Sequence, residues 1–322
     1  MSNSAAPESV PAGARLRRLL AYLEVDPNNL TLLLDAIREA ASTRLWGIAL
    51  HLVETGLARH LDQEVALTVL RARCLQHMER RAEAIEDCKR CLALAPDNAE
   101  AAGFLALLLY EQKRIREAGT YIDSALAVDP AQLEALLARA SWQLDMRNLE
   151  AARASFNTLV QAHPTCGRAW FGLALLDLGQ MQLEAAQCAI ELAAQYMQEH
   201  IGTWHILAWI QILRGDIATA ATAFERALAL NRNFGETHGG LAVIAALQGR
   251  EGEARTSLKR ALRLDPQCMA AQCAQYLLLH HQGQHSSAQA LMDAFLARPL
   301  TGDESGQTFR DVVATKMRRL HS

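Results

Sequence analysis

The sequence predicts an all-α protein made of stacked antiparallel helix pairs, and three observations support this fold class. Apolar residues recur at helical spacing, as in the series Trp204, Leu207, Ala208 and Gln211. A small residue recurs at a fixed interval along most of the chain, and turn-forming residues follow at the same interval. A fixed period of this size is typical of a helical repeat that buries its apolar face only against its neighbours.

The period is clearest in the alanines that begin each second helix. Their spacing is 35 residues once and 34 residues six times, in the series Ala49, Ala84, Ala118, Ala152, Ala186, Ala220, Ala254 and Ala288. An insertion anywhere would break this register, so the one extra residue is placed between the first two members, near His60. The predicted repeats cover residues 30–64, 65–98, 99–132, 133–166, 167–200, 201–234, 235–268 and 269–302.

The repeat at 201–234 shows the pattern best. Its first helix ends at Gly215-Asp216, and its second helix carries the apolar stripe Ala220, Phe224, Ala227 and Leu228. The unit resembles the tetratricopeptide repeat, with the pattern W-x2-L-G-x2-Y, then A-x3-F, then P. Trp204, Leu207, Ala220, Phe224 and Ala227 match, whereas Ala208, Gln211 and Arg232 replace the Gly, Tyr and Pro. The resemblance implies a right-handed α-solenoid whose first helices line a concave groove.

The segments outside the repeats have their own patterns. Residues 1–13 are rich in Ser, Ala and Pro, which predicts a disordered segment. Residues 14–29 predict an N-terminal capping helix followed by a turn. Residues 303–322 predict a C-terminal capping helix, with an apolar stripe of Phe309, Val312, Val313, Met317 and Leu320.

Composition narrows the range of partners and locations. The net charge of −3 argues against a general nucleic-acid or membrane-surface binder. No window of about 18 uncharged apolar residues predicts a membrane span, and the first residues lack the apolar run of a secretory signal. The seven cysteines, an odd number at core-like positions, favour reduced thiols and a cytoplasmic location.

Catalytic and metal-binding motifs are not recognisable. The sequence has no phosphate-binding loop, no H-E-x-x-H and no G-x-S-x-G, so we expect a non-enzymatic protein without a cofactor. Cys88 and Cys91 form C-x2-C, but they fall on a packing face, and core packing is favoured over a zinc site. For His280, His281 and His285 a solvated turn is favoured over a metal site.

The family resemblance also indicates where a ligand would bind, namely the second, fifth, sixth, ninth, twelfth and thirteenth positions of the first helices. These positions include mostly apolar residues, which we take as the candidate groove: Phe104, Leu107, Tyr110, Leu137, Leu144, Phe171, Leu175, His205, Trp209 and Ile212. Arg73, Asp145 and Arg168 are expected at its ends, where they would fix the register of a bound peptide. Gly103, Gly172, Gly239 and Gly240 are expected to leave room for it. The alternative is that these apolar faces pack against adjacent first helices.

The predicted function is a protein-interaction scaffold or chaperone-like adaptor that binds an apolar peptide or helix of a client protein. The composition suggests a bacterial protein, and the resemblance suggests secretion or pilus assembly as its setting. The Lys, Asn and Arg clamp that grips chaperone tails in one subgroup of the family is missing, which argues against that ligand. The alternatives are a peptide-sensing regulator and a scaffold that self-associates through its terminal repeats.

Overall fold

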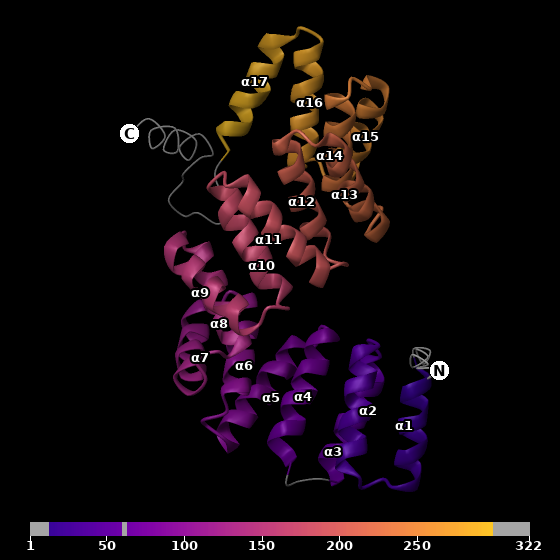
Figure 1. Ribbon diagram of the computed structural model, residues 1–322, viewed down its shortest axis with the longest axis vertical. Coiled ribbons are helices and arrows are strands. Elements are labelled where there is room, and N and C mark those ends of the chain that lie inside the picture. Colours follow the sequence, from indigo (N-terminus) through magenta and orange to yellow (C-terminus); the bar gives the residue numbers. More distant parts are fainter. Residues whose placement is uncertain (1–12, 60–62, 299–322) are drawn as a thin grey trace, which may run out of the picture. The chain divides into compact units, whose positions relative to one another are not determined.

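A computed structural model describes residues 13–59 and 63–298, and these residues contain α-helices and no strand. The all-α fold class is therefore confirmed. The chain divides into two compact units, the first ending at Thr165 and the second beginning at Cys166 (Figure 1). The predicted disordered segment, apart from Gly13, and the predicted C-terminal capping helix at 303–322 lie outside the described residues.

The first unit consists of one leading helix and four antiparallel pairs, α2 with α3 through to α8 with α9. Its helices are α1 (Ala14–Val25), α2 (Leu30–Ser42), α3 (Trp46–Arg59), α4 (Glu64–His77), α5 (Arg81–Leu94), α6 (Ala99–Glu111), α7 (Ile115–Val128), α8 (Leu133–Asp145) and α9 (Leu149–Ala162). Each pair also packs against the next pair in the unit.

The second unit consists of four more pairs, α10 with α11 through to α16 with α17. Its helices are α10 (Gly167–Gly179), α11 (Leu183–Tyr196), α12 (Ile201–Arg214), α13 (Ile217–Leu230), α14 (Gly235–Leu247), α15 (Glu251–Leu264), α16 (Met269–His281) and α17 (His285–Leu296). No helix in the described part of the chain is long and apolar enough to cross a membrane.

The periodic alanines lie where the two helices of a pair cross. All eight are buried, and none is more than 2% exposed. A methyl side chain lets the two backbones approach closely, whereas a larger side chain would overpack the crossing. The sequence period is therefore the period of the helix crossings.

The turn inside each pair is made by one residue with a positive φ angle. The eight residues follow the same register: Arg44, Glu79, Lys113, Arg147, Met181, Gly215, Gly249 and Gly283. Such a left-handed residue ends a helix by returning the next N–H groups to its last carbonyls; the amide of Lys113, for example, donates to the carbonyl of Tyr110 at 2.8 Å. Glycine adopts this conformation without strain, but only the last three turns use it.

Candidate functional site

In the first unit, the protein's own side chains occupy the space where the sequence predicted an open groove. Phe104, Leu107, Tyr110 and Leu137 are buried, with at most 9% of each residue exposed, and Leu144 is half-buried. Buried side chains of this kind cannot form an open groove wall, so for these four residues the structure shows the alternative of packing between helices. Polar residues nearby, described next, hold these side chains between the helices.

Arg73 connects three first helices of this unit. Its guanidinium donates from Nη2 to Glu100 Oε1 at 2.9 Å and from Nη1 to Glu134 Oε1 at 2.8 Å, and it lies 4.8 Å from the centre of the Phe104 ring. Arg73 belongs to α4, Glu100 to α6 and Glu134 to α8. The expectation that Arg73 holds the end of a bound peptide therefore gives way to a role within the protein.

Asp145 has a similar role at the end of α8. Its Oδ2 accepts a hydrogen bond from the Tyr110 hydroxyl at 2.7 Å and lies 3.7 Å from Lys113 Nζ. This carboxylate therefore joins α6 to α8 instead of standing free at a groove end. The third predicted polar residue, Arg168, is exposed in the first turn of α10.

The glycines of the first helices also meet protein. A Cβ atom added at Gly103 would lie 1.8 Å from Gln132 Oε1, and one at Gly239 would lie 2.7 Å from the Ala271 backbone nitrogen. One at Gly240 would lie 2.2 Å from Cζ of Phe224. These three glycines therefore allow close packing of neighbouring helices, and the expectation that they leave room for a ligand is corrected.

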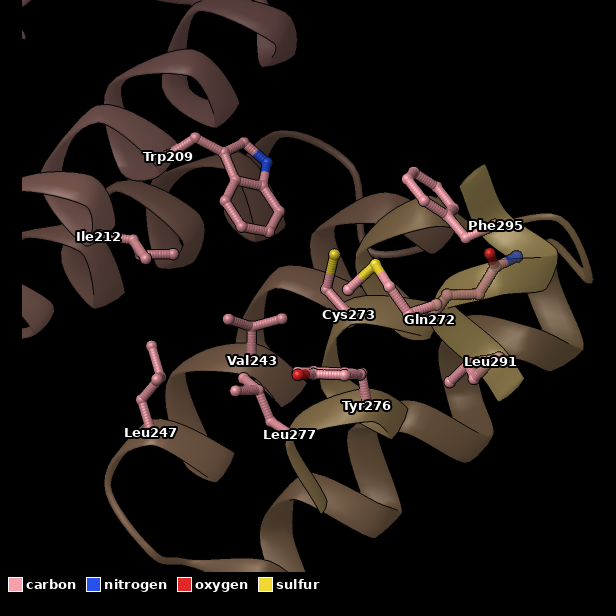
Figure 2. A pocket seen from close by; sticks show the side chains of 11 residues that line it. Trp209, Ile212, Val243, Leu247, Gln272, Cys273, Tyr276, Leu277, Leu291 and Phe295 are labelled. Atoms are coloured by element: carbon pink, nitrogen blue, oxygen red, sulfur yellow. The ribbon is translucent and has the colours of Figure 1, made fainter. Parts of the chain in front are cut away.

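In the second unit, by contrast, two of the predicted residues line a pocket. Trp209 and Ile212 of α12 face a cavity of about 250 Å³, which is also lined by α14, α16 and α17 (Figure 2). The other lining residues are Val243 and Leu247 from α14, Gln272, Cys273, Tyr276 and Leu277 from α16, and Leu291, Met292 and Phe295 from α17. Figure 2 shows the indole of Trp209 pointing from one side of this pocket toward α16 and α17.

The pocket wall is almost entirely hydrocarbon. None of its lining residues is charged, and its polar side-chain groups are the Trp209 indole N–H, the Gln272 amide, the Tyr276 hydroxyl and the Cys273 thiol. Burial raises the pKa of the Cys273 thiol, which keeps it protonated near neutral pH. An apolar pocket with a few polar groups suits an apolar ligand whose orientation is fixed by one or two hydrogen bonds.

Trp209 is held in place by aromatic packing. The indole lies edge-on to Phe224 of α13, with ring centres 6.0 Å apart. His205, one turn earlier in α12, lies 5.6 Å from the same ring, and its Nε2 is 2.8 Å from the Thr237 hydroxyl of α14. Burial lowers the pKa of His205 to about 4, so this side chain is neutral at pH 7. His205 therefore supports the pocket from behind and does not line it.

The two predicted residues on α10 do not line the pocket either. Phe171 and Leu175 are half-buried, and the Phe171 ring meets His200 edge-on, with ring centres 5.4 Å apart. His200 is the N-cap of α12. Phe171 therefore contributes to the packing of α10 against α12.

Nine pocket residues were not among the predicted ones, and a signal for four of them is present in the sequence. Val243, Leu247, Cys273 and Leu277 occupy the same first-helix positions, counted from Gly235 and Met269, as the residues chosen in the earlier repeats. The residues of α17 belong to a second helix, so the positional rule gives no reason to choose them.

The cysteine pair behaves as core. Cys88 and Cys91 are both 0% exposed, and burial raises the pKa of the Cys91 thiol to about 11 and that of Cys88 further. His280 lies next to His285, with ring centres 4.9 Å apart. Within residues 13–59 and 63–298, no group of three or more His, Cys, Asp or Glu side chains is arranged to hold a metal ion.

Family comparisons agree with the geometry of the helix pairs. Tetratricopeptide repeat models match residues 75–140, 137–200 and 207–268, which is more than half of the chain. The chain belongs to the tetratricopeptide repeat family. No curated protein matches this tetratricopeptide repeat protein.

Several solved structures share its fold. PilF of Pseudomonas aeruginosa is 15% identical, with a TM-score of 0.57 over 66% of this chain and 96% of PilF. PilW, a type IV pilus biogenesis factor, is 16% identical, with a TM-score of 0.55 over 65% of this chain and 97% of PilW. A chain of the APC/C heterotetramer Cut9–Hcn1 is 16% identical, with a TM-score of 0.66 over 82% of this chain and 52% of that one. At this identity the likeness shows the fold alone.

Proposed function

We propose that this tetratricopeptide repeat protein binds an apolar helix of a partner protein in the pocket of its second unit. The observation that carries the proposal is the uncharged wall formed by Trp209, Ile212, Val243 and Leu247 together with α16 and α17. Tetratricopeptide repeats serve as protein-interaction scaffolds, and an amphipathic helix laid into an apolar groove is a recurrent mode of such binding. The first unit, whose groove is filled by its own side chains, then has a supporting role.

The proposed ligand follows from the dimensions of the pocket. A cavity of about 250 Å³ accepts two or three bulky side chains from one face of a helix. Burial of two or three such anchors, about 250 Å² of apolar surface, contributes roughly 6 kcal/mol before the cost of ordering the peptide. Affinities in the micromolar range follow from that magnitude.

The setting of this activity is part of the proposal. PilF and PilW share the fold, and PilW is a pilus biogenesis factor, so shielding of an apolar segment during pilus assembly or secretion is the first role to test. The pocket offers a protonated thiol, an amide, a phenol and an indole N–H as its polar groups, which supports a binding role without catalysis. A cytoplasmic location, expected from the free thiols, belongs to the same proposal.

The test uses two leucines of nearly equal exposure. Leu247, 39% exposed, lines the pocket, whereas Leu264, 37% exposed, lies at the end of α15 and does not. Random peptides of helical length are selected on a display library against the full chain, and the enriched peptides are measured by fluorescence anisotropy. We expect an apolar i, i+3, i+4 pattern in them and a loss of at least about 30-fold in affinity for Leu247→Asp, which corresponds to about 2 kcal/mol.

The control variant Leu264→Asp should bind these peptides as the wild type does. Both variants place one carboxylate on a half-exposed helix surface, so general effects of charge cancel between them. Equal binding to the wild type and to Leu247→Asp would show that the peptides bind elsewhere and would refute the proposed site.

A further inference from the structure

The wall of the pocket formed by α17 is incompletely covered. Of the twelve residues of α17 only Ala288 is buried, whereas α13, the second helix two pairs earlier, buries four. Leu291, Met292 and Phe295 line the pocket and are partly exposed; Figure 2 labels the first and the last of them. Because α17 lines the pocket on one side and is little buried by the rest of the protein, another apolar segment can pack against it.

The chain itself continues directly from this wall. Phe295 lines the pocket, and the described residues end at Arg298, three positions later. The sequence then runs through a mostly polar stretch, residues 301–308, to the apolar series Phe309, Val312, Val313, Met317 and Leu320. Spacings of three and four residues place these side chains on one face of a helix.

We propose that residues 309–320 bind the pocket as a helix when no partner is present and are displaced by the partner; this inference rests on the function proposed above for the pocket. The connection is long enough, because a flexible chain of the ten residues between Arg298 and Phe309 spans about 16–19 Å on average. The segment also has the bulky apolar side chains that an uncharged wall accepts. In a helix Asp311 and Arg318 fall on the opposite face, whereas Lys316, seven residues after Phe309, falls on the apolar side. The partner helix then presents a similar apolar series.

Attachment to the same chain makes even a weak contact effective. A short flexible connection gives an effective concentration of about 1 mM. With an intrinsic dissociation constant of about 100 µM, typical of a small apolar contact, the segment occupies the pocket in about ten molecules of every eleven. The apparent affinity for the partner is then lowered about ten-fold, because only the open fraction binds.

Cys273 reports directly on this occupancy. It lines the pocket and is exposed in the described structure, so a bound segment covers it. Cys188 on α11 is also exposed and does not line the pocket, which makes it an internal reference. The rate of alkylation by N-ethylmaleimide is measured at both residues by mass spectrometry in the full chain.

The variant Phe309→Ser/Val313→Ser removes two of the five residues of the apolar series, and Asp311→Ser/Arg318→Ser is the control on the opposite face, with no change in net charge. We expect Cys273 to react about ten-fold faster in the first variant and at the wild-type rate in the second, with Cys188 unchanged in both. A synthetic peptide of residues 303–322, added to the first variant, should restore protection, and the same peptide with both serines should not. Equal Cys273 rates in all three proteins, or a peptide without effect, would overturn the inference.

Dilution separates this occupant from a second copy of the protein. Protection by a segment of the same chain is independent of protein concentration, whereas protection that disappears between 10 µM and 0.1 µM, about a hundred-fold dilution, would assign the contact to another molecule and overturn the inference. Failure here is also distinguishable from failure of the proposed function. Selected peptides that depend on Leu247 while Cys273 remains unprotected would leave the binding function standing without this regulation.

Discussion

Replacing Gly240 by alanine should destabilise the second unit, although alanine is the better helix former. In an exposed helix the exchange would contribute about 1 kcal/mol to stability. Here the new Cβ would lie 2.2 Å from Cζ and 2.3 Å from Cε1 of Phe224. The Phe224 ring is 0% exposed and packs against His205 and Trp209, so it has little space to move away.

The cost of overpacking and the gain in helix propensity together give the expected change in the free energy of unfolding. Overpacking of a buried site costs about 1–3 kcal/mol, and a Cβ this close to two ring atoms belongs at the upper end of that range. After the gain in helix propensity is subtracted, we expect a net loss of about 2 kcal/mol in the free energy of unfolding. The shifted ring should also disturb Trp209, and with it the pocket wall.

Urea denaturation followed by far-ultraviolet circular dichroism and by tryptophan fluorescence measures this loss. The matched control is Gly119→Ala in the middle of α7, where an added Cβ meets nothing within 4 Å. The control should gain about 0.5–1 kcal/mol, so the same chemical change is expected to have opposite signs at the two sites. A Gly240→Ala variant as stable as the wild type would contradict the close approach of α14 to Phe224.

Three further predictions concern one or two residues each. Met181 has a φ of 60° in a turn, so Met181→Gly should raise the free energy of unfolding by about 0.5–1 kcal/mol in urea, since relief of strain exceeds the entropy that glycine adds to the unfolded chain. Burial lowers the pKa of His205 in the folded protein to about 4, so on acidification the imidazole is protonated in the unfolded chain before it is protonated in the folded protein. The free energy of unfolding should therefore fall by about 1–2 kcal/mol as the pH drops from about 6.5 to 4. The variant His205→Gln should lose this part of the pH dependence. Cys88 and Cys91, whose thiol pKa values burial raises, should react with a thiol reagent far more slowly than exposed Cys188, and elemental analysis should find no stoichiometric zinc; one zinc per chain that is lost in Cys88→Ala would contradict their core role.

The fold class was predictable because its cause is local and repeats. A methyl group is required at each helix crossing, so the alanine series from Ala49 to Ala288 records the crossings directly in the sequence. The turns follow the same register, but five of the eight left-handed positions carry a residue other than glycine. The turn positions are therefore not recognisable from the sequence, because residues such as Lys113 and Met181 do not indicate a positive φ.

The candidate site was predictable only in part. Trp209 and Ile212 line the pocket, and the same positional rule applied to later repeats would add Val243 and Leu247. In the first unit the outcome depended on Arg73, whose partner Glu134 is 61 residues away. The reach of one long side chain across two repeats depends on the spacing of the helices, and a positional rule that treats each repeat by itself does not contain that information.

The distribution of glycine among the turns has a consequence for the order of folding. All three glycine turns, at Gly215, Gly249 and Gly283, lie in the second unit, whereas each turn built on another residue costs about 1 kcal/mol more to form. In repeat arrays, folding begins where a hairpin is least costly and propagates to its neighbours. We therefore expect nucleation between α12 and α17, so that the part of the described chain that leaves the ribosome last is the first to acquire stable structure.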